Sequence, residues 1–368
     1  MLSFIGMDVA PFFRWPGVSR AHFSLHPAHL AGLIASRASD GTGTSLLDRL
    51  FTSSTSIFAP ESAPAHDIFR LSMFVLIVTA AIFLIVCGLL AYVVIRYRHR
   101  PGDDDSEPPQ IYGSNPIELA WTVIPILIVI VLFLSTARVI FLIQHAKQPR
   151  TALNVSVVGH RYWWEFRYPK YGFVTANELH VPVSNDPKHP MPTFLKLVTS
   201  DVDHSFWVPR LNGKQDLIAG QVNSMWIEPE ATGVYLGQCA QYCGEEHARM
   251  LLRVYAQTPA NFKKWAENQQ KAAVDDPAVA EGRAVFLQNA CVNCHAVKGT
   301  MADGRFGPDL THLMTRDTIA AGTLKNNREN LIKWIEDPDA YKPGCLMPAM
   351  GLSHDDVDKL VSYLVTLH

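Results

Sequence analysis

The 368-residue chain has no excess of charge of either sign, no disulfide framework and no visible internal repeat. Its 32 Lys and Arg residues nearly balance its 34 Asp and Glu residues, which gives a net charge of -2 at pH 7. Such a balance gives no indication of binding to nucleic acid or to a strongly acidic ligand. Only six cysteines are present, and four of them lie in two short motifs, which argues against a disulfide-stapled scaffold.

Two long uncharged runs are the first positive feature. Leu71–Ile95 contains 25 residues and Leu119–Ala137 contains 19, so each is long enough to cross a hydrocarbon core of roughly 30 Å. Pro125, in the second run, is tolerated in a membrane helix. Two buried core helices are the alternative, but runs this long and apolar favour a two-helix transmembrane hairpin over residues 63–148. Arginines occur in the connecting loop and at the outer ends, so the positive-inside rule does not orient it.

The remaining segments differ in composition and in the secondary structure that they favour. Residues 1–62 lack the charged, apolar and small-residue order of a signal peptide and are predicted to form a poorly defined extension. Short β-prone segments in residues 149–258 indicate a β-sandwich or barrel of about one hundred residues. The polar stretch 259–276 is predicted to end this domain with a helix and to link it to an α-helical domain over 277–368. Examples of these β-prone segments are Leu153–Val158, Tyr162–Tyr168, Phe194–Thr199, Gln221–Ile227 and Gly233–Gly237.

A C-x-x-C-H motif lies in the C-terminal domain, with Cys291, Cys294 and His295. This pattern is the attachment signature of a c-type haem, in which the two thiols form thioethers with the vinyl groups and the histidine binds iron. A string of five positions can arise by chance, so its context matters. A predicted helix, Ala278–Asn289, leads into the motif, and a Pro-Gly-x-x-Met segment ending at Met347 follows it.

A second group of metal-binding residues lies about fifty positions upstream. Cys239, Cys243, His247 and Met250 fall within twelve residues, and His204 precedes them. Soft sulfur ligands combined with imidazole suit copper. A structural zinc site favours closer cysteine pairs and has no use for a thioether, and a disulfide would not need the histidines. The set therefore favours copper over both alternatives.

The segment 201–209, followed by this Cys/His/Met loop, resembles the binuclear CuA domain of cytochrome c oxidase subunit II. The resemblance implies a cupredoxin-like β-barrel in which two thiolates bridge two copper ions. The implied ligands are Cys239 and Cys243 as bridges, His204 and Met250 on one copper, and His247 with the backbone carbonyl of Gln241 on the other. In that family the residue at Gln241 is usually a Glu that helps to hold magnesium, so the replacement puts the magnesium site in doubt.

Two further positions follow from the same resemblance. Glu118, in the segment Glu118–Pro125, matches a glutamate near the entrance of a proton pathway into subunit I, although an ordinary helix-end carboxylate is the plain alternative. Tyr162 stands where the family usually has the tryptophan that receives electrons, and it is followed by Trp163 and Trp164. Tyr162 and Trp163 are therefore candidate electron-transfer residues, with strand aromatics of the core as the alternative.

The C-terminal domain resembles a class I cytochrome c. The resemblance implies His295 and Met347 as the axial iron ligands, with the carbonyl of Pro308 orienting the imidazole. Met350 also lies nearby, but Met347 occupies the family position between Pro343-Gly344 and Pro348. Cys345 receives no chemical role.

Together the segments resemble subunit II of a caa-type cytochrome c oxidase with a fused cytochrome c domain. The resemblance implies a multi-pass protein of the bacterial inner (cytoplasmic) membrane with both termini and both metal domains on the outer, periplasmic side. Electrons from a donor, either a cytochrome c or a quinol-oxidising complex, would pass through haem c and CuA to the haem-copper subunit I, which reduces oxygen and pumps protons. The alternatives are the electron-entry subunit of a CuA-containing nitric oxide reductase and a membrane-anchored electron carrier.

Overall fold

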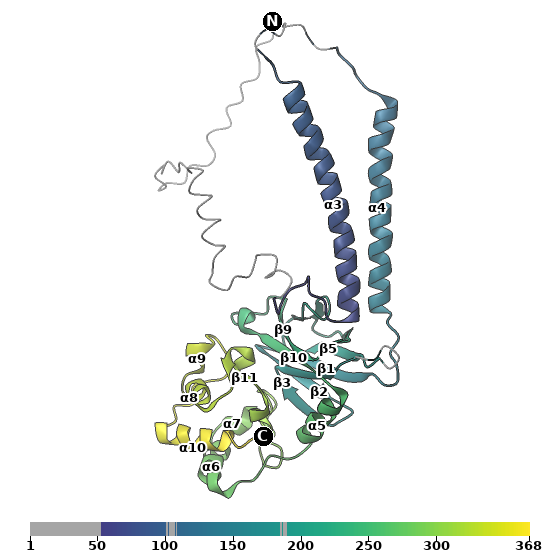
Figure 1. Cartoon of the computed structure of the whole chain (residues 1–368). Helices are drawn as coiled ribbons and strands as arrows, with labels where there is room; N and C mark the ends of the chain where they lie inside the picture. Colours follow the sequence, from purple (N-terminus) through teal and green to yellow (C-terminus); the bar gives the residue numbers. More distant parts are fainter. Residues whose placement is uncertain (1–52, 101, 103–106, 108, 185, 187–189) are drawn as a thin grey trace, which may run out of the picture. The chain divides into compact units, whose positions relative to one another are not determined.

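Two long helices precede the β domain in the described part of the chain (Figure 1). The computed structural model describes residues 53–368 except 101, 103–106, 108, 185 and 187–189, so the predicted extension lies outside the described residues up to position 52. Helix α3 spans Ala63–Arg96 and α4 spans Asn115–Gln144, and each has a proline in its first turn. In the described part of the chain these two helices are long and apolar enough to cross a membrane, and their apolar stretches are not buried. Their exposure excludes the core-helix alternative.

The residues just before α3 are attached to the β domain. The carboxylate of Glu61 accepts a hydrogen bond from Arg210 at 2.7 Å, and the buried hydroxyl of Ser62 accepts one from the backbone N–H of Glu228 at 2.9 Å. Both residues fall within the predicted N-terminal extension. Their partners lie about 150 positions away, which a local sequence pattern does not record.

Ten of the described strands form two five-stranded sheets that enclose one apolar core. One sheet has the order β3-β2-β1-β5-β8 and the other β4-β10-β9-β6-β7. The strands are β1 Leu153–His160, β2 Trp163–Tyr168, β3 Phe173–Ala176, β4 Glu178–Pro182, β5 Thr193–Thr199, β6 His204–Trp207, β7 Gln215–Leu217, β8 Asn223–Ile227, β9 Gly233–Cys239 and β10 Leu251–Gln257. The five predicted strands correspond to β1, β2, β5, β8 and β9.

Helix α5, Pro259–Gln269, belongs to the β domain. Phe262 and Ala266 are buried in its core, and the ring of Trp265 stacks on His180 of β4 with centroids 4.0 Å apart. The hydroxyl of Thr258 caps the helix by accepting a hydrogen bond from the backbone N–H of Asn261. The polar stretch predicted to end this domain with a helix does so, and only the residues after Gln269 connect it to the next domain.

The C-terminal domain is helical, as the sequence predicts. Its helices are α6 Ala280–Gln288, α7 Cys291–Cys294, α8 Arg328–Glu336, α9 Pro338–Tyr341 and α10 His354–Leu364, with a two-stranded ladder of β11 Thr318–Ile319 and β12 Leu324–Lys325. Ser353 caps α10 by accepting a hydrogen bond from Asp356 at 3.1 Å, which is the predicted start. A β-carbon at Gly282 of α6 would collide with the backbone of Lys359, so glycine permits the close packing of α6 on α10.

Candidate metal and haem centres

The copper-type residues lie on a single loop and one neighbouring strand. Strand β9 ends at Cys239 and β10 begins directly after Met250. The backbone N–H of Cys239 donates to the carbonyl of Met250 at 3.0 Å, which closes the loop between them. A short 3-10 turn, His247–Arg249, brings His247 back toward the sulfurs. His204 comes from the start of β6, which pairs with β9.

All six predicted copper donors meet at this loop. Cys239 and Cys243 have free thiols with sulfur atoms 4.0 Å apart. Each sulfur also lies near one imidazole nitrogen. The Gln241 carbonyl oxygen lies at a similar distance from the Cys239 sulfur, and the Met250 sulfur from the Cys243 sulfur. The distances are 3.9 Å from Cys239 Sγ to His204 Nδ1, 3.2 Å from Cys239 Sγ to the Gln241 carbonyl oxygen, 3.6 Å from Cys243 Sγ to His247 Nδ1, and 3.9 Å from Cys243 Sγ to Met250 Sδ.

The two thiols influence each other because their sulfurs lie side by side. Contact with the Cys243 thiol and with His204 lowers the pKa of Cys239, despite the opposing effect of burial. Contact with the Cys239 sulfur, together with burial, raises the pKa of Cys243. A metal that binds both sulfurs must therefore displace the proton of Cys243. Two thiolates, two imidazoles and a thioether form a donor set that fits copper better than zinc.

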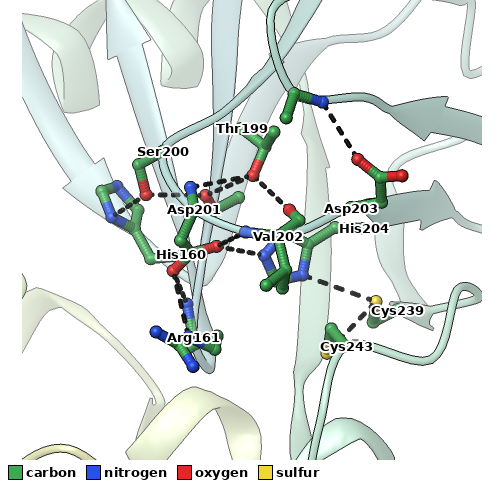
Figure 2. Close-up of polar contacts among 12 residues, drawn as sticks. His160, Arg161, Thr199, Ser200, Asp201, Val202, Asp203, His204, Cys239 and Cys243 are labelled. Atoms are coloured by element: carbon green, nitrogen blue, oxygen red, sulfur yellow. Dashed lines mark hydrogen bonds and ion pairs between the residues drawn. The ribbon is translucent and has the colours of Figure 1, made fainter.

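Asp201 holds His204 in place from the side opposite the sulfurs (Figure 2). Its carboxylate lies 2.8 Å from His204 Nε2, and it also accepts hydrogen bonds from the backbone N–H groups of Arg161 and Val202, each at 2.7 Å. Burial lowers the pKa of His204, but Asp201 and Cys239 raise it more, so the net shift is upward. A partner on Nε2 leaves Nδ1 directed at the sulfurs, which is how outer carboxylates orient metal-binding histidines. Sequence analysis did not identify Asp201 in this role.

Gly159 leaves room for the ring of His204. A β-carbon at this position would lie 2.7 Å from Cδ2 of the imidazole, closer than side chains approach. The end of β1 is therefore shaped around the histidine.

The C-x-x-C-H residues line a cavity of about 290 Å³ with mainly apolar walls. Cys291 and Cys294 lie on helix α7, and His295 follows it. The His295 ring places Nδ1 2.7 Å from the carbonyl oxygen of Pro308, as predicted, so Nδ1 is occupied as a donor and Nε2 is left for a metal. Burial lowers the pKa of His295, which favours the neutral, ligating form. A β-carbon on Gly307 would lie 2.6 Å from this ring, so glycine is required beside it.

Met347 and Met350 both line this cavity. Met347 also packs against the buried core of the C-terminal domain. The thiol of Cys345 lies 3.5 Å from the carbonyl oxygen of Met347, so it supports the local turn.

Arg316 is a cavity residue that sequence analysis missed. Its side chain is 7% exposed, and one guanidinium nitrogen donates to the carbonyl of Asp309 at 2.5 Å. Its Nε is buried and has no hydrogen-bond partner among the described residues. A buried, unpaired donor at the wall of the cavity that the C-x-x-C-H residues line fits a propionate carboxylate. A single arginine in a helical region carries no sequence signal of this kind.

Tyr162 lies between the cavity and the copper-type loop. It is 9% exposed, and it lines the cavity together with Trp163. Its hydroxyl packs so closely on Gly244 of the loop that a β-carbon there would clash. Trp163 stacks on His160 with ring centroids 4.3 Å apart. Tyr162 is thus buried beside both sites rather than displayed on an open surface.

Glu118 lies in the first turn of α4. Its side chain is exposed, and Oε1 accepts a hydrogen bond from the backbone N–H of Ser114 at 3.3 Å. This contact is the one expected of an ordinary carboxylate at the end of a helix. The role of Glu118 at the entrance of a proton pathway therefore stays a prediction.

Comparisons with known proteins agree with this arrangement in chain order. Residues 53–139 match the transmembrane domain of cytochrome c oxidase subunit II, 153–257 its periplasmic domain, and 279–368 cytochrome c. The periplasmic domain of subunit II of cytochrome oxidase (CoxB) of Bradyrhizobium japonicum is 26% identical, covering 33% of this chain and 96% of that one with a TM-score of 0.31.

Full-length relatives extend the match to most of the chain. Cytochrome c oxidase subunit 2 of Alkalihalophilus pseudofirmus is 36% identical over 84% of this chain and 89% of its own length. The protein of the same name from Bacillus sp. is 35% identical over 74% of this chain and 80% of its own length. With the two apolar helices, the β domain and the helical cytochrome c domain in the same order, the chain belongs to the cytochrome c oxidase subunit II family as a membrane protein with periplasmic domains.

Proposed function

We propose that this chain is the electron-entry subunit of a terminal cytochrome c oxidase, passing electrons from a covalently attached haem c to a binuclear CuA centre and on to subunit I. One observation supports it most: the two donor sets lie on one chain with the buried side chain of Tyr162 against both. When bound, copper and haem supply the one-electron carriers. The residues of this chain would hold them, with the buried side chain of Tyr162 between the two sites.

The proposed copper ligands are the six donors of the β9–β10 loop and β6. Cys239 and Cys243 would supply thiolates shared by the two ions, His204 and Met250 would complete one, and His247 with the Gln241 carbonyl would complete the other. The sulfurs are buried, and Asp201 keeps His204 oriented. Ligands held this firmly before binding resist rearrangement when the charge of the centre changes.

The proposed haem site uses Cys291 and Cys294 for attachment, with His295 and Met347 as axial ligands. His295 is held by the Pro308 carbonyl, and Arg316 offers a buried donor to a propionate. The apolar wall shields the group from water, and an axial thioether raises its potential.

The complex in which the chain works is also part of the proposal. Haem attachment outside the cytoplasmic membrane places both metal domains on the periplasmic face of the bacterial inner membrane. The α3–α4 hairpin then contacts subunit I, where oxygen is reduced and protons are pumped, and Glu118 lies at the entrance of a proton path. A cytochrome c or a quinol-oxidising complex delivers the electrons.

The binuclear copper site can be tested by metal content and electron paramagnetic resonance of the full chain expressed without haem attachment. We expect two copper ions per chain and the hyperfine pattern of one electron shared by two nuclei. Cys239→Ser should abolish this pattern, Met250→Leu should perturb it, and Cys87→Ser, on the exposed face of α3, should leave it unchanged. A single-copper pattern, or zinc bound in preference to copper, would contradict the assignment.

The axial ligand can be tested by comparing two methionines of the same cavity. Met347→Ala should remove the sulfur-to-iron absorption band and lower the haem potential, since an axial thioether favours ferrous iron. Met350→Ala is the matched control and should retain the band. The reverse result would assign the ligand to Met350.

The order of electron entry can be tested by ending the chain after Gln269, which keeps α5 in its core position. In the assembled complex we expect turnover with a reduced soluble cytochrome to fall at least about tenfold, because a donor carried on the same chain makes the transfer to copper intramolecular. Turnover with an artificial donor that bypasses the haem domain should be retained. Unchanged turnover with the soluble cytochrome would mean that the β domain accepts electrons directly.

A further inference from the structure

Buried polar side chains join the haem domain to the β domain at two separate places. The described residues of both domains belong to one compact unit. At the first place, the ammonium group of Lys342 donates to the carbonyl oxygen of Tyr162 at 2.7 Å and to that of Arg249 at 3.1 Å. Lys342 follows α9 and is 3% exposed. A lysine this deeply buried is uncommon unless it is paired.

The surroundings of Lys342 explain why its charge is tolerated. Burial lowers its pKa to about 8, and the nearby carboxylate of Glu246 opposes this shift. Glu246 is itself 4% exposed, and its Oε2 has no hydrogen-bond partner within the described part of the chain. The ammonium group thus rests on two β-domain carbonyls and lies near the Glu246 carboxylate, whose other oxygen is paired with Arg249, and it would lose these contacts if the domains separated.

Both carbonyls belong to residues that lie next to the proposed metal sites. Arg249 directly precedes the copper donor Met250, and Tyr162 lies against the haem cavity and the copper loop. Two residues after Lys342, Gly344 has a φ of +76° and lies beside the side chain of Glu245 in the copper loop. One short segment of the haem domain, which leads on to Met347, is therefore seated on the copper loop.

The second place is the carboxylate of Glu178 on β4. Its Oε1 accepts hydrogen bonds from the backbone N–H and the hydroxyl of Thr318, each at 2.9 Å, and its Oε2 accepts one from the N–H of Asp317 at 3.1 Å. Glu178 is 1% exposed. Tyr255 of β10 donates to the carboxylate of Asp317 at 2.5 Å. A buried carboxylate whose partners all come from the other domain needs that domain in place.

The connection after α5 is also attached to the haem domain. The side-chain amide of Gln269 donates to the hydroxyl of Thr315 at 3.2 Å. The backbone N–H of Ala273 donates to the carbonyl of Lys298 at 2.9 Å, and Lys298 in turn donates to the carbonyl of Gln270 at 2.5 Å. The linker is thus part of the haem-domain surface and not a free tether.

We propose that Lys342 is a positioning residue that, together with Glu178, docks the haem domain on the β domain and holds the Met347 segment against the copper loop. The fused cytochrome then works as a fixed donor, with Tyr162 covered by the dock and closed to a soluble partner. The effect on electron transfer rests on the proposed function, whereas the docking of the two domains does not need bound metal.

The test uses the full chain, in its assembled and metal-loaded complex, with Lys342→Met. The change keeps the length of the side chain and removes the donors. Lys325→Met, an exposed lysine on β12 of the same domain, is the matched control. Hydrogen exchange at the amides of Asp317 and Thr318 reports docking directly, and photoreduction of haem c followed at the copper band reports electron transfer within the chain.

We expect Lys342→Met to speed exchange at these amides at least about tenfold, the equilibrium equivalent of losing one hydrogen bond to a charged group, and to slow transfer within the chain. The copper and haem spectra should stay unchanged, and Lys325→Met should behave as the unaltered chain. Glu178→Gln should also speed exchange at the amides of Asp317 and Thr318. Because this change does not touch the Met347 segment, it tests the docking even if Lys342→Met disturbs the haem. Exchange and transfer equal to the control in both variants would overturn the proposal. Absence of a copper signal in the unaltered chain would instead refute the proposed function, while the amide exchange would still decide the docking.

Discussion

The hydrogen bond from the Cys239 N–H to the Met250 carbonyl is the interaction on which the rest of the metal region depends. It joins the last residue of β9 to the residue just before β10 at 3.0 Å, so the intervening loop must fold back over its own ends. Cys243 and His247 are brought to Cys239 and Met250 in this way. The pairing of β9 with β6 then supplies His204 from the other side. A donor set assembled by sheet register is held in place before any metal arrives, since register is strongly specified where the strands are buried.

The same loop is the surface on which the haem domain rests. The ring of Tyr162 packs against Gly244, and the ammonium group of Lys342 donates a hydrogen bond to the carbonyl of Arg249. A change in the loop would therefore alter both the copper donors and the seat of the cytochrome. Close contact of this kind suits transfer between two fixed carriers, because no diffusional search or reordering of a linker precedes each event.

Local patterns in the sequence predicted the elements and the ligand residues that depend on short-range spacing. The apolar runs predicted the α3–α4 hairpin, the C-x-x-C-H motif lies where the haem cavity forms, and the resemblance to subunit II predicted a donor set that the structure brings together. The order of domains and the family were confirmed by the comparisons. Ligand roles, the binuclear character of the copper site and the part played by Glu118 remain predictions.

The features that the sequence could not predict depend on polar residues that are buried by contacts with residues far away in the chain. Strand β4 has no clear sequence signal because Glu178 and His180 are polar residues, typical of a surface, and only Thr318 and Trp265 cover them in the fold. Lys342 reads as an ordinary loop lysine, and its partner Tyr162 is 180 positions away. No period of two or 3.6 residues encodes such pairs, since these periods report only which face of one element is apolar.

The central claim is that haem c and the copper centre work in series on one rigid chain. The most direct test is anaerobic rapid mixing of the assembled complex with a reduced soluble cytochrome, following the haem c and copper absorption bands separately. The account predicts that haem c is reduced first, at a rate that rises with donor concentration. Copper should follow at a rate that becomes independent of the donor. Copper reduction that precedes haem c, or that keeps rising in rate with donor concentration, would contradict it.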